Sequence, residues 1–201
     1  MILTSLRKTS LEHVSLVWET EEETPSTLGV VTTFRLFAGR EVDPETRFHI
    51  EQESAVALLR EKALEWISRR QYSAKELSQK MIQKGASPEN SEAVISWLTE
   101  HHYIDEQLYA SAIVRHYSNK GYGPGRIRAE LSRRGIPRDY WEDALQECPD
   151  PAGDLDSILA KKLSDPSDRK QVQKAAAFLY RHGYSWTDIQ AAIERIRINE
   201  Y

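Results

Sequence analysis

The sequence predicts a mainly α-helical protein: a tandem array of three three-helix units in a curved arrangement, preceded by a small β-hairpin-like segment. The first observation behind this prediction is an internal repeat. Stretches that begin at residues 64, 114 and 176 can be laid over one another, with offsets of 50 and 62 residues. Each stretch then places a tyrosine in register, at Tyr72, Tyr122 and Tyr184. A unit of this size that recurs three times is typical of modular arrays, which present extended surfaces for binding.

The second observation is a change of hydrophobic period near residue 47. Residues 14–18 and 29–37 are rich in β-branched and aromatic side chains, and a polar stretch with a proline, residues 21–26, lies between them. This pattern predicts two strands around a turn, as a hairpin or small sheet. We expect residues 1–47 to pack on the first helical unit, because a two-stranded hairpin alone is barely stable.

The first helical unit is predicted at residues 48–104, with helices at about 55–71, 74–84 and 88–101. Ser73 and Glu76 are spaced as a capping box, in which each side chain accepts a hydrogen bond from the other residue's backbone amide. Gly85 stands where a left-handed residue ends a helix, and Pro88 stands in the first turn of the next one.

The second unit is predicted at residues 105–149. Asp105 is the expected N-cap of its first helix, and a glycine-rich turn follows at residues 121–125. A helix that carries Ile127 and Leu131 then runs to Gly135, and Pro137 restarts the chain. The buried face of the first helix is predicted to hold Tyr109, Ala112, Ile113, His116 and Tyr117.

The third unit is predicted at residues 150–201. Residues 150–153 are interpreted as a linker, residues 165–168 as a helix break, and the pair Ser185 and Asp188 as a second capping box. With Gly183 in register with Gly121, this unit lacks a counterpart of the helix at 88–101. An additional helix at 152–164 restores the count of three.

The charged residues are distributed unevenly. The net charge is −4, and residues 1–55 carry five basic and ten acidic side chains. The stretch from residue 115 to 138 reverses this balance, with seven basic side chains and one acid, Glu130. Such a cluster could bind phosphate or an acidic protein face, or it could be a solvated helix face. The candidate partner- or DNA-binding residues are Arg115, Lys120, Arg126, Arg128, Arg133, Arg134 and Arg138.

Composition and motifs point away from an enzyme or a membrane protein. No apolar run approaches the roughly 20 residues needed to span a bilayer, and we see no signal peptide. Cys148 is the single cysteine, which fits a reducing cytosol. We therefore expect a cytoplasmic monomer with no catalytic residues, metal or cofactor. Trp66, Trp97, Trp141 and Tyr117 are interpreted as core residues, not as platforms for stacking on bases.

The segment Gly121-Tyr122-Gly123-Pro124-Gly125 invites comparison with a phosphate-binding loop. A phosphate loop follows a buried strand and ends in Gly-Lys-Ser/Thr, whereas this one follows a predicted helix and continues with Arg126. Glycine is needed here for the backbone geometry of the turn. Anion binding at the following helix N-terminus is kept as a minor alternative.

Several short motifs together resemble one family. They are RRQYSAKEL at residues 69–77, YIDEQLYA at 103–110, GYGPGRIRAEL at 121–131 with RGI at 134–136, and FLYRHGYS at 178–185. The combination is similar to the RecX family of recombinase regulators over roughly residues 48–196. Glu106 stands where the family usually has aspartate, and His182 where it usually has arginine.

The resemblance implies a protein that binds in the helical groove of the filament formed by RecA on single-stranded DNA. It implies suppression of the filament's ATP turnover, strand exchange and co-protease activity. It also implies some affinity for single- or double-stranded DNA, for which the cluster between residues 115 and 138 is the natural place. The alternative is a direct DNA-binding protein of the helix-turn-helix type, although the net charge of −4 argues against high intrinsic DNA affinity.

Overall fold

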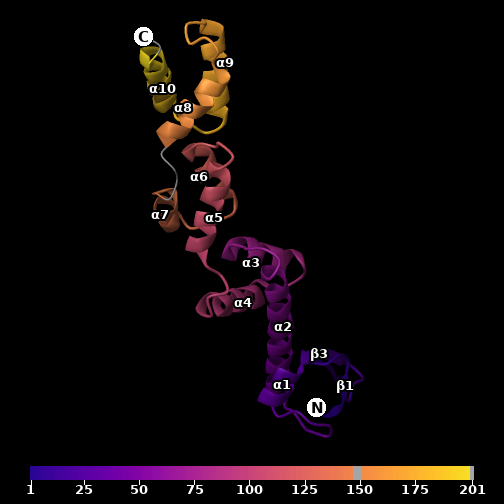
Figure 1. Cartoon of the computed structure of the whole chain (residues 1–201). Helices are drawn as coiled ribbons and strands as arrows, with labels where there is room; N and C mark the ends of the chain where they lie inside the picture. Colours follow the sequence, from indigo (N-terminus) through magenta and orange to yellow (C-terminus); the bar gives the residue numbers. More distant parts are fainter. Residues whose placement is uncertain (147–150, 200–201) are drawn as a thin grey trace. The chain divides into compact units, whose positions relative to one another are not determined.

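The computed structural model describes residues 1–146 and 151–199. They fall into two compact units, Met1–Ile104 and Asp105–Tyr201. The first unit holds a three-stranded sheet and helices α1 to α4, and the second holds α5 to α10 (Figure 1). The prediction of a mainly helical chain with a small N-terminal β-structure is confirmed.

The N-terminal sheet has three antiparallel strands in the order β1 (Leu3–Lys8), β2 (His13–Trp18) and β3 (Glu23–Thr27). Leu16 and Trp18 are buried in a core that also contains Ile50 from helix α2. The predicted strand at 14–18 is confirmed, but the one at 29–37 is wrong. The residues predicted as a turn form β3 instead, and helix α1 (Leu28–Thr33) follows directly. The Thr27 hydroxyl starts this helix by accepting a hydrogen bond from the Val30 amide.

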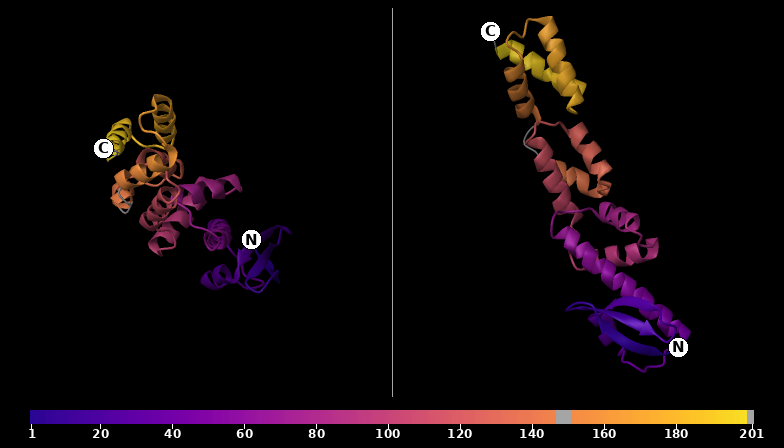
Figure 2. Two further views of the ribbon diagram at one scale, coloured as in Figure 1. Left: turned by 45° about the horizontal axis from the view of Figure 1, so that its top comes forward. Right: turned by 90° about the vertical axis from the view of Figure 1, so that its right-hand side faces the viewer.

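Helix α2 (Pro44–Ile67) joins the sheet to the first three-helix domain, as Figure 2 shows. It begins well before the predicted residue 55, because the Asp43 carboxylate caps it by accepting from the Thr46 amide. It packs against both β3 and α4.

Helices α3 (Ala74–Gln83) and α4 (Pro88–Glu100) complete that domain. The capping box of Ser73 and Glu76 is present with both hydrogen bonds, and Gly85 has a φ of 95°. The core is built from side chains of all three helices that are 0–7% exposed, among them Ala63, Trp66, Leu77, Met81, Val94 and Leu98.

The second domain contains α5 (Glu106–Ser118), α6 (Pro124–Arg133), a short 3-10 helix η1 (Arg138–Tyr140) and α7 (Trp141–Gln146). Asp105 caps α5 as predicted, through the Leu108 amide. The prediction that His116 is buried is wrong, because its side chain is exposed. Helix α5 packs against both α6 and α7, so its buried face is broad and includes Ala110 and Val114 instead.

The third domain contains α8 (Pro151–Lys162), α9 (Arg169–Arg181) and α10 (Trp186–Asn199). The predicted linker at 150–153 is wrong from Pro151 onward, because α8 begins there; residue 150 lies outside the described residues. The break at 165–168 is confirmed, with Asp168 capping α9. The second capping box is confirmed in one of its two hydrogen bonds, because the Ser185 hydroxyl accepts from the Asp188 amide at 3.1 Å. The Asp188 carboxylate accepts from the Ser185 hydroxyl at 2.5 Å.

The repeat register of the third domain differs from the predicted one. Gly85, Gly135 and Gly183 all have positive φ and end the second helix of their domains. Each turn closes with the same hydrogen bond across five residues, from the amides of Ala86, Ile136 and Tyr184 to the carbonyls of Met81, Leu131 and Leu179. Helix α10 therefore corresponds to α4 and α7, and α8 is the ordinary first helix of a complete third domain.

The aromatic side chains predicted as core residues lie inside or against the cores. Trp66 is 7% exposed. Trp97 is partly buried against the core of the first domain, and Tyr117 and Trp141 against that of the second. The Trp141 indole also donates to the Ile136 carbonyl at 3.0 Å.

Candidate interaction surface

All seven basic residues singled out in the sequence lie in the second domain, on α5, in the turn that follows it, on α6 and in the segment that follows α6. Six of them are exposed, and Arg134 is half-buried. Their side chains differ in what they contact, and this difference separates structural residues from those available to a partner.

Arg133 and Arg134 serve the fold, because both bind the carboxylate of Glu130. Glu130 is 4% exposed. Its oxygens accept two hydrogen bonds from Arg133, at 2.6 and 2.9 Å, and one from Arg134 at 2.7 Å. The Arg134 guanidinium also donates to the Tyr109 hydroxyl and lies near the Tyr109 ring. The pKa of Glu130 is lowered to about 2, and the hydrogen bonds from Arg133 are the largest cause.

Arg128 and Arg138 have weaker partners on the neighbouring helix. The Arg128 guanidinium lies 3.2 Å from the carboxylate of Glu142, and both side chains are exposed. Arg138 lies over the ring of Trp141, 5.7 Å from its centroid. Exposed contacts of this kind contribute little to stability and leave part of each guanidinium open to a partner.

Arg115, Lys120 and Arg126 are exposed, and within the described part of the chain no hydrogen bond or ion pair engages their side chains. Arg115 lies in the last turn of α5, Lys120 in the turn that follows, and Arg126 in the first turn of α6. These three cations are the members of the cluster that a partner can reach without breaking a contact of the fold.

The turn at residues 121–125 joins the second domain to the third. The Gly123 amide donates to the His182 carbonyl at 2.8 Å, and the Gly125 amide to the Gly183 carbonyl at 2.9 Å. Backbone amides at the start of α6 thus donate to carbonyls at the end of α9, which have no partner within their own helix. These amides are therefore occupied, and the alternative that an anion binds at this helix start is wrong.

The glycines at this junction allow the two backbones to touch. A Cβ atom on Gly123 would lie 2.7 Å from the carbonyl carbon and oxygen of Gly183, and one on Gly183 would lie 2.2 Å from the Arg126 nitrogen. A stack of rings borders the contact, with Tyr122 on His182 at 5.1 Å and Phe178 on His182 at 3.8 Å.

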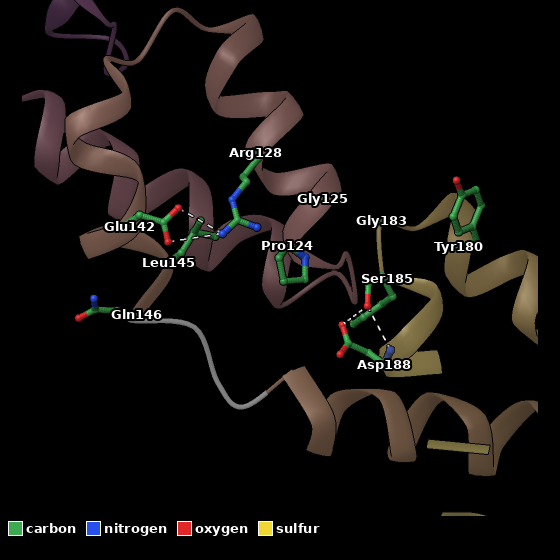
Figure 3. Close-up of a pocket in the computed structure, with 11 residues that line it drawn as sticks. Pro124, Gly125, Arg128, Glu142, Leu145, Gln146, Tyr180, Gly183, Ser185 and Asp188 are labelled. Atoms are coloured by element: carbon green, nitrogen blue, oxygen red, sulfur yellow. Dashed lines mark hydrogen bonds and ion pairs between the residues drawn. The ribbon is translucent and has the colours of Figure 1, made fainter. Parts of the chain in front are cut away.

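An open groove of about 720 Å³ lies beside this junction. Figure 3 shows Arg128 and Glu142 on one side of it, and Ser185 with Asp188 at the start of α10 on the other. Tyr180, 63% exposed, also lines the groove. Sequence reasoning missed Tyr180 as a groove residue, because the walls of the groove come from segments about 40 to 60 residues apart.

Comparison with known proteins identifies the three domains. Residues 60–98 match the family described as RecX, first three-helix domain; residues 105–145 match the second and residues 157–193 the third. Together these matches cover more than half of the chain. The chain belongs to the RecX family.

Individual RecX proteins agree with this assignment. The chain is 34% identical over 154 residues to the regulatory protein RecX of Salmonella arizonae, covering 68% of this chain and 90% of that one. It is 36% identical over 130 residues to that of Pseudomonas fluorescens, covering 63% and 84%.

Two solved structures share the fold. A crystal structure of regulatory protein RecX has a TM-score of 0.78 at 22% identity and covers 96% of this chain and 98% of that one. The crystal structure of RecX from Lactobacillus salivarius has a TM-score of 0.64 at 23% identity and covers 72% and 97%.

The described part of this RecX chain shows no group of three or more histidine, cysteine, aspartate or glutamate side chains placed to hold a metal ion. In the same residues, no helix has both the length and the apolar character needed to cross a bilayer. Cys148 lies outside the described residues.

Proposed function

We propose that this RecX family member binds the filament that RecA forms on single-stranded DNA and lowers its ATP turnover, strand exchange and co-protease activity. The observation that carries the proposal is that one chain holds all three RecX three-helix domains. The protein acts as a cytoplasmic, non-enzymatic monomer, by contact alone.

Repetition in both partners supports this mode of binding. A helical polymer offers the same surface at every protomer, and three similar domains on one chain can engage several of these surfaces at once. Linked contacts multiply, so the whole chain can bind tightly even where each domain binds weakly. A chain that bridges protomers binds only one arrangement of the filament, and it therefore opposes the rearrangements that ATP hydrolysis and strand exchange require.

The test is co-sedimentation of the chain with RecA filaments assembled on single-stranded DNA with a nucleotide analogue, together with the RecA ATPase rate. We expect the chain to sediment with the filament and to lower the rate. Bare single-stranded DNA is the control, and binding to it should weaken with salt with a slope near −2 if about three phosphates are contacted. Equal affinity for bare DNA and for the filament would favour the direct DNA-binding alternative.

The exposed cations of the second domain are the residues we expect to contact the filament. Changing Arg115, Lys120 and Arg126 together to glutamine should raise the concentration needed for half-inhibition of the ATPase about tenfold, since each exposed pair contributes a fraction of a kcal/mol. Folding should be unaffected, because within the described residues these side chains have no partner to lose.

Arg128→Gln is the control, because it removes a cation of α6, the helix that carries Arg126, and this cation already faces Glu142. We expect it to change inhibition less than twofold. An unaltered half-inhibition concentration in the triple variant, with an intact circular dichroism spectrum, would remove these cations from the binding surface.

A further inference from the structure

A second groove, of about 700 Å³, runs along helix α2 in the first unit. Its wall on α2 extends from Ala55 through Leu58 to Trp66, which is about 16 Å at 1.5 Å per residue. The opposite wall is the turn between α3 and α4, from Lys84 to Ser87. An elongated trough of this length matches three turns of a helix.

The floor of the groove is apolar and incompletely covered. Leu59 and Ala86 pack against the core of the first domain, and Trp66 belongs to it. Leu58 is half-buried and, among the described residues, joins neither of the two hydrophobic cores of this unit. A half-exposed leucine in an apolar trough is a position where another apolar side chain would gain by burial.

The rim of the groove is positively charged. Lys62 and Lys84 are both among its lining residues and both exposed. The amino-terminal end of α4, capped by Ser87, lies at the same wall and adds a partial positive charge. None of the described residues that line the groove is acidic, although Glu65 pairs with Lys62 outside it at 2.5 Å. The charge of the rim therefore favours an acidic occupant.

The internal repeat indicates what kind of element fits here. In the third domain, the turn equivalent to Lys84–Ser87 receives the start of helix α6 on its carbonyls, and residues 183–185 line the groove beside it. In the first domain the same turn is open, because a Cβ atom on Gly85 would meet nothing within 4 Å. The copy of the turn in the third domain thus docks a helix N-terminus, and the copy in the first domain presents the same backbone with two lysines beside it.

We propose that the groove along α2 binds the first turns of an amphipathic helix in a partner protein. Apolar side chains of that helix lie on Leu58 and Trp66, and acidic residues in its first turn lie beside Lys62 and Lys84. Acidic residues are favourable at a helix N-terminus in their own right, so such a segment would be stable in the bound form. This inference does not depend on RecA being the partner.

The test uses a fluorescein-labelled synthetic peptide of 16 residues, with a serine cap, three glutamates in its first turns and leucines at helical spacing. Fluorescence anisotropy with the full chain should show saturable binding at a dissociation constant on the order of 10–100 μM. A peptide with glutamine in place of glutamate, and one with alanine in place of leucine, should each bind at least fivefold more weakly.

Two variants test whether the peptide binds in the groove. Lys84→Glu and Leu58→Gln should each weaken the acidic peptide about tenfold, whereas Lys75→Glu, an exposed lysine of α3 outside the groove, should leave it unchanged. Thermal unfolding should confirm that Leu58→Gln folds, since Leu58 is not a core residue. Absence of saturable binding, or equal binding by the glutamine peptide or by both groove variants, would overturn the proposal.

Discussion

A single methyl group at position 123 is expected to separate the second and third domains. Gly123 has a φ of −78°, which any residue adopts, so alanine adds no backbone strain there. Its Cβ atom would nevertheless lie 2.7 Å from the backbone of Gly183 and Tyr184, which cannot rotate away as a side chain can. We expect Gly123→Ala to destabilise the junction by about 1–3 kcal/mol, the range for overpacking.

Gly183→Ala should be more severe, because two penalties combine. The residue has a φ of 92°, and its Cβ atom would lie 2.2 Å from the Arg126 nitrogen. Left-handed backbone costs an alanine about 1–2 kcal/mol, to which the clash is added. Gly85→Ala measures the backbone penalty without the clash. Gly85 has a φ of 95° in the equivalent turn, and nothing lies within 4 Å of its Cβ position.

Hydrogen exchange at the Gly125 amide measures the junction directly, because that amide bonds to the Gly183 carbonyl. In Gly123→Ala we expect faster exchange there and a separate urea transition for the third domain, while Gly85→Ala shows neither. Wild-type protection of the Gly125 amide in Gly123→Ala would mean that the backbone contact does not hold the two domains together.

The turns that end the second helix of each domain show which parts of the fold the sequence predicts. The helix caps at Ser73 and Asp105 and the left-handed Gly85 and Gly135 were predictable, because these signals are local. The register of the third domain was not. A glycine followed by a large apolar side chain ends both α5 and α9, and the turns after these helices close with the same hydrogen-bond pattern. Sequence alone could not tell which helix of the repeat Gly183 terminates.

The sequence shows that basic residues are concentrated between positions 115 and 138, but it does not show which of them the fold uses and which are open to a partner. Arg133 and Arg134 follow Glu130 at three and four residues, a spacing that signals ion pairs on a helix. What the sequence could not show is that Glu130 is buried, which makes this pairing a structural one. The groove beside Tyr180 could not be predicted from the sequence, because its walls come from segments about 40 to 60 residues apart.

The burial of Glu130 leads to the second large effect. Glu130→Gln keeps the shape of the side chain but removes the charge that holds Arg133 and Arg134. At neutral pH we expect the free energy of unfolding to fall by about 2–3 kcal/mol, because loss of one partner leaves the half-buried Arg134 guanidinium without its carboxylate. Glu142→Gln is the control, since Glu142 pairs with Arg128 in an exposed position and should cost less than about 0.5 kcal/mol.

The pH dependence of that difference tests the cause. The pKa of Glu130 is lowered from 4.5 to about 2 in the folded chain, chiefly by the hydrogen bonds from Arg133. A lowered carboxyl pKa stabilises the folded state above the unfolded value, and this stabilisation disappears as the pH falls through the folded value. A shift of this size corresponds to about 3 kcal/mol. The stability gap between wild type and Glu130→Gln should therefore be full at pH 7 and close between about pH 4.5 and 2. A gap that stays constant over this range in urea unfolding would mean that the variant acts through packing and not through the charge of Glu130.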